Sequence, residues 1–128
     1  MDNIASEVWA VTRLEKLAQQ FSDGVAAQTD AVRAGDARIG NKHAKRYIRA
    51  FETLRSLGDE GRDALVPLLS GGTRKDVRAM AAAYLLRYRH GEAPRVLEEL
   101  ARGEGFVAFS AGETLKRWDE KTWQLDPP

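Results

Sequence analysis

Residues 76–85 read DVRAMAAAYL, and the apolar pattern of this stretch returns thirty residues later. Three apolar positions spaced by fours correspond at an offset of 30: Val77, Ala81 and Leu85 with Val107, Ala111 and Leu115. An upstream pair in each copy follows an offset of 31: Leu65 and Leu69 with Val96 and Leu100. Each copy therefore reads as a helical hairpin. Stacked hairpins at this period are typical of solenoids, in which the apolar face of one unit is covered by its neighbour.

Glycines and prolines divide this part of the chain into short helices. We expect four of them, at about residues 60–70, 74–89, 94–102 and 106–118. Pro67 is tolerated in the first of these only if it lies in the opening turns. Thr73-x-x-Asp76 reads as a capping box for the second, and Pro94 is expected near the first position of the third.

The N-terminal quarter has a different pattern, that of one long amphipathic helix. Residues 3–33 carry apolar side chains at intervals of three, four and seven: Ile4, Val8, Val11, Leu14, Ala18, Phe21, Val25 and Val32. Such a helix is about 45 Å long, and Gly24 marks a candidate bend or break within it. Gly35 supplies a left-handed stop and Asp36 the cap of a second helix over 37–57. The short linker makes these two helices an antiparallel hairpin.

The stretch Asp76-Val77-Arg78-x-x-Ala81-Ala82-x-x-Leu85 resembles the second helix of a HEAT repeat, where the Asp and Arg commonly lie at the surface between repeats. Four further motifs occur in a familiar order: Gly35-Asp36 with Asn41, Gly61-Arg62-x-Ala64-Leu65-x-Pro67-Leu68-Leu69, Ala93-x-x-Val96-Leu97-Glu98, and Ala111-x-x-Thr114-Leu115. Over roughly residues 10–120 the chain is similar to a small bacterial family, domain of unknown function 2019, with HEAT-like helices. The resemblance implies a fold and a bacterial origin, and no activity. The basic helix 37–57 and the Trp-containing C-terminus depart from the family pattern.

Composition agrees with a helical fold, because 19 Ala and 13 Leu stand against 11 Val plus Ile among the 128 residues. We predict an all-α fold, in which a long N-terminal hairpin is followed by two HEAT-like hairpins in a short right-handed α-solenoid. One domain is expected over residues 1–120, with a C-terminal tail over 121–128.

Charge and cysteine content exclude several classes of function. The chain has no cysteine, which rules out disulfides, thiolate zinc sites and cysteine nucleophiles. Twenty basic residues against 19 acidic ones give a net charge of +1, so no global field recruits nucleic acid or a membrane. The first residues, Met-Asp-Asn-Ile, have no basic n-region and no apolar h-region, and no apolar run reaches membrane length. We therefore expect a cytoplasmic protein that does not associate with membranes.

Catalytic and metal-binding groups are few. His43 and His90 have no ligand-type partner at helical spacing, which favours surface or capping roles. Each acidic doublet, at 59–60, 98–99 and 119–120, points its two carboxylates about 100° apart, so none forms a catalytic pair by itself. Ser110 lacks the strand–turn–helix context of a nucleophile elbow. We expect no enzyme activity, no cofactor and no metal.

The helix over 37–57 offers the strongest candidate surface. Arg38, Lys42, Lys45 and Arg49 recur at intervals of four, three and four, which places them on one helix face. Such a face binds acidic protein surfaces or phosphates, although Glu52, Asp59 and Glu60 offer the alternative of a solvated, internally balanced face. The full set of candidate partner-binding residues is Arg38, Lys42, Lys45, Arg46, Arg49, Arg78 and Trp123.

Two hypotheses for function follow from this surface. The first is a non-catalytic protein-binding module of the immunity or antitoxin type, whose partner has an acidic surface. The second is a helical-repeat protein that binds nucleic acid or phosphate, which is weakened because Tyr47 belongs to the apolar face and few aromatics are left to stack bases. Trp123, beyond the last helix, either staples the tail to the body or is an exposed anchor for a partner.

Overall fold

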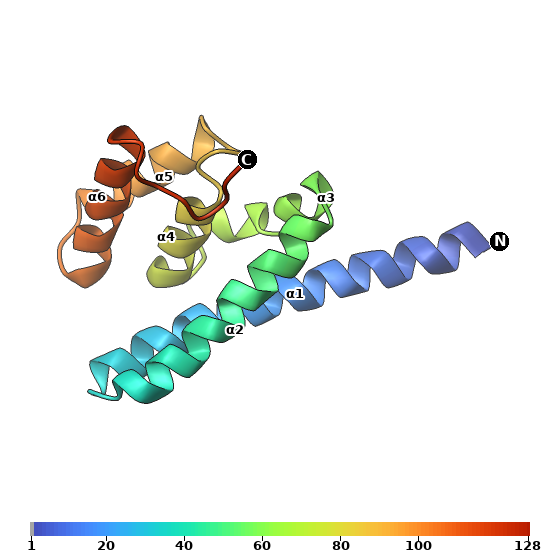
Figure 1. Cartoon of the computed structure of the whole chain (residues 1–128), viewed down its shortest axis with the longest axis horizontal. Helices are drawn as coiled ribbons and strands as arrows, with labels where there is room; N and C mark the ends of the chain where they lie inside the picture. The colour runs from blue at the N-terminus through green and yellow to red at the C-terminus, as the bar shows by residue number, and fades with distance from the viewer. Residues whose placement is uncertain (1) are drawn as a thin grey trace. The chain divides into compact units, whose positions relative to one another are not determined.

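The computed structural model describes the backbone of residues 2–128 and the side chains of residues 8, 9 and 12–128 (Figure 1). The described chain contains six α-helices and one 3-10 helix, and no strand occurs within it, which confirms the all-α prediction. By its contacts the chain divides into two compact units, Met1–Ala64 and Leu65–Pro128. The expectation of one domain over residues 1–120 stays a prediction.

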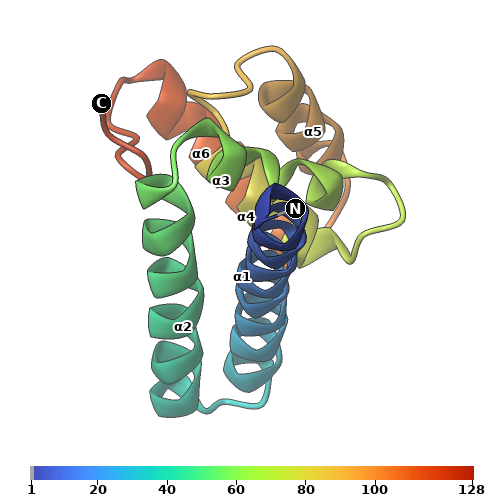
Figure 2. The ribbon, with the colours of Figure 1, turned by 90° about the vertical axis from the view of Figure 1, so that its right-hand side faces the viewer.

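The first unit is built on an antiparallel hairpin of α1 (Asp2–Arg33) and α2 (Ala37–Ser56), in agreement with the two predicted helices (Figure 2). Gly35 adopts the expected left-handed conformation with φ of 79°. The side chain of Asp36 accepts a hydrogen bond from the Ile39 amide at 3.1 Å and so caps α2. A short helix, α3 (Asp59–Asp63), closes the unit.

The α1–α2 seam depends on glycine. Helix α1 continues through Gly24 without a break, because this residue serves close packing rather than a turn. A Cβ placed on Gly24 would lie 3.1 Å from the Tyr47 Cβ and 3.2 Å from the His43 carbonyl oxygen of α2. On α2, Gly40 is buried and faces Val32 in the same way. The two helix backbones can therefore approach closely.

The predicted apolar stripe of α1 is buried in the middle of the helix and exposed toward its two ends. Phe21 and Val25 are buried, and the Phe21 ring meets the Tyr47 ring edge-on at 5.8 Å. Val8 and Val32 are exposed, against expectation. Helix α1 has 32 residues and α2 only 20, so the first part of α1 extends beyond the end of α2 (Figure 1). Two stripe positions, Ile4 and Val11, lie outside the described side chains.

The second unit contains three α-helices after a short 3-10 helix, η1 (Val66–Leu69): α4 (Lys75–Tyr84), α5 (Glu92–Ala101) and α6 (Phe106–Asp119). Helix α5 packs against α4 and α6, and α4 also contacts η1 and α6. Most of α4 is buried, including the alanines at 81, 82 and 83.

Three local expectations need correction. The predicted helix over 60–70 is interrupted between Asp63 and Val66, because Pro67 lacks an amide hydrogen and its ring excludes the preceding turn of α-helix. The predicted helix to about 89 ends at Tyr84. Helix α5 begins at Glu92, so Pro94 is its third residue rather than its first.

The capping box at the start of α4 does not form. Arg74 occupies the cap position and no side chain caps the helix. The Thr73 hydroxyl lies 3.3 Å from that of Ser70 instead. The Asp76 carboxylate accepts from the adjacent Val77 amide and pairs with Arg74 Nε at 2.9 Å. Thr73 and Asp76 therefore both have polar partners, but these are not the backbone amides that a capping box would supply.

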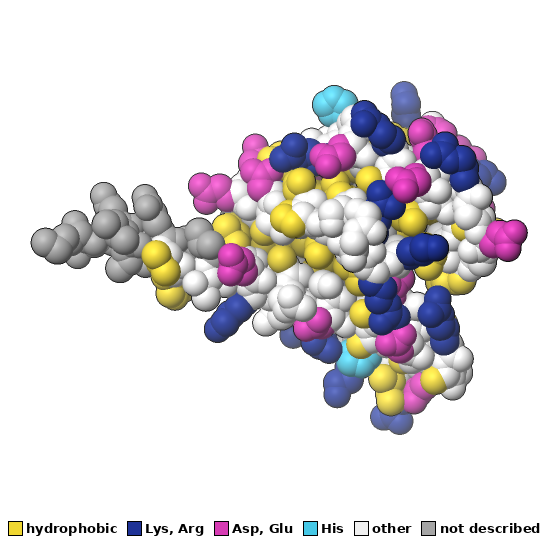
Figure 3. Space-filling view, turned by 180° about the vertical axis from the view of Figure 1, so that it is seen from behind, with side chains coloured by type: hydrophobic (Ala, Val, Ile, Leu, Met, Phe, Trp, Pro, Cys, Tyr) yellow, Lys and Arg dark blue, Asp and Glu magenta, His cyan; other side chains and the backbone are white. Residues whose placement is uncertain are grey.

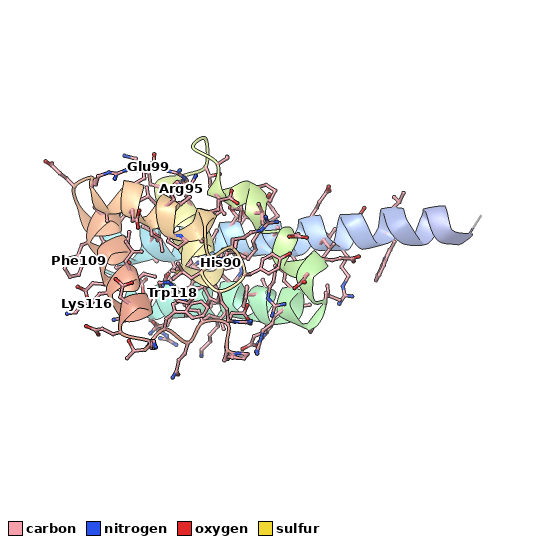
Figure 4. All side chains as sticks on the ribbon, turned by 90° about the horizontal axis from the view of Figure 1, so that it is seen from above. His90, Arg95, Glu99, Phe109, Lys116 and Trp118 are labelled. Atoms are coloured by element: carbon pink, nitrogen blue, oxygen red, sulfur yellow. The ribbon has the colours of Figure 1, made fainter. Side chains whose placement is uncertain are left out.

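The C-terminal residues pack on their own unit, and Trp123 staples them there. Its indole Nε1 donates to the Ala83 carbonyl at 2.8 Å, and its ring meets Trp118 edge-on at 5.2 Å (Figure 4 labels Trp118). Asp126 is fully buried and pairs with Arg87 at 3.2 Å. Arg87 Nε also donates to the Asp126 carbonyl at 2.7 Å.

Candidate partner-binding face

The outer side of α2 carries the predicted row of cations. Successive helix residues turn by about 100°, so the four members lie within about 60° of one another and opposite the buried Tyr47 and Leu54. All four side chains are exposed, and together they are called the α2 basic face: Arg38, Lys42, Lys45 and Arg49. Folding directs this face to solvent because the opposite side of α2 packs on α1.

The charges of the α2 basic face are not neutralised by contacts. Among the side chains that the structure describes, no carboxylate forms an ion pair with any of its four members. Of the three acids considered as balancing partners, Asp59 pairs with Arg62 at 3.4 Å instead. Asp36 is engaged as the helix cap. On the side of the molecule drawn in Figure 3, basic and acidic side chains are interspersed.

Arg46 lies beside the α2 basic face and is partly engaged. Its Nη1 donates to His43 Nδ1 at 2.9 Å, and the His43 side chain is half-buried. This contact holds the guanidinium over the flank of the helix. Arg46 therefore keeps its charge at the edge of the face rather than in its centre.

Tyr47 is not available as an aromatic platform on α2. Its ring is buried in the seam with Phe21. Burial raises the pKa of the Tyr47 phenol, and this effect exceeds that of a hydrogen bond with Gln28, which lowers the pKa. The α2 basic face therefore offers cations without a stacking ring of its own helix.

Arg78 belongs to the second unit and is held there by two contacts. Its side chain is only 12% exposed, its Nε donates to the Leu69 carbonyl at 2.9 Å, and its Nη2 pairs with Glu99 at 3.0 Å. The guanidinium thus ties α4 to both η1 and α5. Hydrogen bonding and charge from Arg78 hold the pKa of the Glu99 carboxyl below its usual range.

The remaining predicted residue, Trp123, is likewise engaged in the second unit, through Ala83 and Trp118. The structure thus brings the five α2 cations together on one helix and gives Arg78 and Trp123 packing contacts of their own. Within the described side chains, no group of three His, Cys, Asp or Glu residues is placed to hold a metal ion. No described helix combines the length and the apolar character needed to cross a membrane.

Sequence reasoning missed two features. The first is the exposure of Phe106 and Phe109, whose spacing of three places them together on one side of α6, away from its buried alanines. The spacing of three was visible in the sequence and would have placed both rings on the same side of the helix. The second is the buried pair of Arg87 and Asp126, which are 39 residues apart and carry no local signal.

An exposed row of cations without paired carboxylates can bind carboxylates or phosphates. Comparisons with protein-family models, with curated proteins and with solved structures found no significant match.

Proposed function

We propose that this chain is a non-catalytic protein-binding module that presents the α2 basic face to an acidic surface of a partner protein. The observation that carries the proposal is that four exposed cations share one side of α2 without a described carboxylate paired to them. Unpaired surface charge costs the free protein little, and it becomes useful when a complementary surface arrives.

The geometry suits recognition of an extended acidic surface. From Arg38 to Arg49 the face spans twelve residues, and the eleven rises between them give a length of about 16 Å. Charges at the rim of an interface mainly raise the association rate and select among partners, with a strong dependence on salt. By analogy with small helical immunity and antitoxin proteins of the bacterial cytoplasm, the module would act by occluding its partner.

The second unit supports a HEAT-like reading of the fold within this proposal. Helix α5 packs between α4 and α6, and the apolar positions of α4 recur on α6 at the offset of 30. In this interpretation η1 with α4, and α5 with α6, are two stacked hairpins that display binding surfaces on a rigid helical frame.

Phosphate binding is the alternative for the same face, because cations without partners also suit a nucleic-acid backbone. The burial of Tyr47 weighs against single-stranded nucleic acid, whose binding usually relies on aromatic stacking. The test below therefore includes oligonucleotides, so that phosphate binding by the α2 basic face can be detected.

The test compares the wild type with a variant in which Arg38, Lys42, Lys45 and Arg49 are all changed to Glu. Each protein is used as bait in an extract of the native host, and captured proteins are identified by mass spectrometry. Binding to a duplex and to a single-stranded oligonucleotide is measured over a salt series. We expect a protein partner that the wild type captures and the α2 variant does not.

A matched control reverses four exposed cations of the second unit and so changes the net charge equally: Lys75, Arg95, Arg117 and Lys121. The control is expected to keep the partner. Equal loss in both variants would show a non-specific charge effect and refute a defined α2 site. Oligonucleotide binding that weakens steeply with salt and disappears only in the α2 variant would establish the phosphate alternative.

A further inference from the structure

The C-terminal tail, residues 121–128, packs on the second unit in the manner of a bound peptide. It contains no helix or strand, and it crosses back over the end of α4 (Figure 1). Six of its eight residues are exposed, whereas Trp123 is half-buried and Asp126 is fully buried. Peptides bound to protein surfaces are held in the same way, by a few anchoring side chains with exposed residues between them.

The first anchor, Trp123, binds at the end of α4. The Ala83 carbonyl belongs to the last turn of this helix, where main-chain oxygens generally lack helical partners. The indole Nε1 of Trp123 donates to that oxygen at 2.8 Å, and its ring lies edge-on to Trp118 at 5.2 Å. A phenylalanine could reproduce the ring contact but not the hydrogen bond, so these contacts distinguish tryptophan from phenylalanine.

The second anchor, Asp126, is held by one arginine at two points. Arg87 Nε donates to the main-chain carbonyl of Asp126 at 2.7 Å, and Arg87 Nη2 pairs with the carboxylate of the same residue at 3.2 Å. Nη2 also lies 3.4 Å from the Pro127 carbonyl oxygen. Because the guanidinium holds the main chain and the carboxylate together, the extra methylene of a glutamate would displace the carboxylate from Nη2. The contacts therefore select aspartate.

The residue that joins the tail to α6 is strained. Among the described residues, Lys121 is the one non-glycine residue with a positive φ, at 61°. A side chain in this left-handed region costs free energy, which a detached tail would recover. Docking of the tail therefore depends on its two anchors, because their contacts must offset this cost.

We propose that the Ala83 carbonyl, Arg87 and Trp118 form a recognition site for a peptide that carries tryptophan and, three residues later, aspartate. The chain's own tail occupies the site until a segment of another protein with the same two anchors displaces it. We call these three groups the tail site. The tail thus competes with the partner for the tail site and sets the affinity that the partner must exceed.

Mass action favours another protein over a second copy as the source of the competing segment. A tail tethered beside its site has an effective concentration in the millimolar range. A second copy offers the same contacts without that advantage, so exchange of tails between copies is unfavourable in dilute solution. Gln124 and Leu125 are exposed, and a segment of another protein can add contacts at these two positions that the tail leaves unused.

Fluorescence anisotropy tests whether the tail site binds a separate peptide. The probe is a dye-labelled synthetic peptide of residues 121–128. The receptor is the full chain with Trp123→Ala and Asp126→Ala, whose own tail lacks both anchors. We expect this double variant to bind the probe, and the wild type to bind it at least about tenfold more weakly because its own tail competes. Circular dichroism checks that the double variant keeps its helix content.

Variants of the probe test the chemistry of each anchor. Asp126→Asn and Asp126→Glu should each weaken binding about tenfold, because the charged pairing with Arg87 is lost or displaced. Trp123→Phe should weaken binding about fivefold through the loss of one hydrogen bond. Gln124→Ala changes an exposed residue between the anchors and is the matched control, which should bind as tightly as the unaltered probe.

A second measurement follows the docked tail in a chain that keeps both anchors, so it does not depend on the folding of the double variant. The chain has no cysteine, and Gln124→Cys therefore provides a single position for a spin label on the tail. We expect the label to be restricted in motion while the tail is docked. An excess of the unlabelled probe should make it mobile, whereas the same excess of the Asp126→Asn probe should not.

Three results would overturn the proposal: no binding of the probe by a double variant that keeps its helix content, equal binding of the unaltered and Asp126→Asn probes, and a spin label that excess probe leaves restricted. A wild-type dimer in sedimentation velocity that is absent from the double variant would identify a second copy as the occupant and would overturn the choice of another protein. Because none of these variants changes the α2 basic face, the outcome is independent of the function proposed above.

Discussion

The two units of this protein differ in how their helices pack. In the first, two long helices meet along a single seam, where Gly24 lies against the backbone of α2 and Gly40 lies against the Val32 side chain of α1. In the second, a short helix, α4, is surrounded, and polar side chains fasten its neighbours to backbone carbonyls. Arg78 reaches Leu69, Arg87 reaches Asp126, and Trp123 reaches Ala83.

This difference explains where free surface remains. A helix in a two-helix seam uses about half of its circumference, so the other half of α2 is left to carry charge. A surrounded helix has no such half, and the second half of α4 accordingly consists mostly of alanine. The long hairpin therefore has free surface on which to display a charged face, whereas in the second unit side-chain contacts hold the segments around α4 in place.

The largest loss of stability is expected for Gly61→Ala in α3, which tests whether close packing of glycine against backbone stabilises the first unit. A Cβ at this position would collide with the main-chain carbonyl of Leu54, which cannot move without disturbing the end of α2. We expect a loss of about 3 kcal/mol in the free energy of unfolding, at the upper end for overpacking. Urea denaturation followed by circular dichroism measures it. Gly71→Ala, where nothing lies within 4 Å, should change stability by less than about 0.5 kcal/mol.

The polar fastening of the second unit is tested by Arg87→Ala. The change leaves the fully buried Asp126 carboxylate without its described ion pair and removes the hydrogen bond to the Asp126 carbonyl. We expect a loss of about 2 kcal/mol, as for other hydrogen bonds to charged groups, reduced by the partial exposure of Arg87. Equal stability of Arg87→Ala and the exposed-site control Arg95→Ala would contradict a fastening role.

A matched pair of glycine substitutions compares the two units directly. Gly24→Ala gains about 1 kcal/mol of helix propensity and loses about 2 kcal/mol to contacts with α2, so a net loss of about 1 kcal/mol is expected. Gly112→Ala on α6 meets nothing within 4 Å and should stabilise by up to about 1 kcal/mol. Thermal denaturation measures both changes. A lower melting temperature for Gly24→Ala and a higher one for Gly112→Ala would confirm that the α1–α2 seam requires its glycine whereas this position of α6 does not.

The smallest expected effect is a pH dependence of the second unit. Because the pKa of Glu99 is lowered in the folded state by Arg78, the folded state binds fewer protons than the unfolded state. The resulting stability is present above the usual pKa of 4.5 and is lost as the pH falls through the lower folded value. Wild type should therefore lose more stability than Glu99→Gln in thermal denaturation between about pH 5 and pH 3. Parallel curves would show that the pair contributes nothing.

Helices could be predicted from the sequence wherever apolar residues recurred at helical spacing along the whole segment. The helices over 3–33 and 37–57, the stop at Gly35 and the cap at Asp36 were predicted and are confirmed. These features depend on residues within a few turns of one another, so a linear pattern contains them.

Features that depend on distant residues could not be predicted. A glycine in a helix has the same sequence appearance whether it breaks the helix or faces another backbone, and only the position of Tyr47 decides the matter for Gly24. The choice between a stapled and an exposed Trp123 depended on a carbonyl 40 residues away. The α2 basic face was predictable because its four cations follow helix spacing, whereas the absence of paired carboxylates needed the structure.

The placement of the three tryptophans gives each unit an optical signature of its own. Trp9 is exposed in the first unit, so its fluorescence should have the red-shifted emission of an indole in water. Trp118 and Trp123 lie edge-on at 5.2 Å in the second unit, close enough for their excited states to couple and produce a paired signal in the ultraviolet circular dichroism spectrum. Release of the C-terminal residues would abolish that paired signal while leaving the emission of Trp9 unchanged. The native chain thus carries a built-in, label-free reporter of whether its C-terminus is docked.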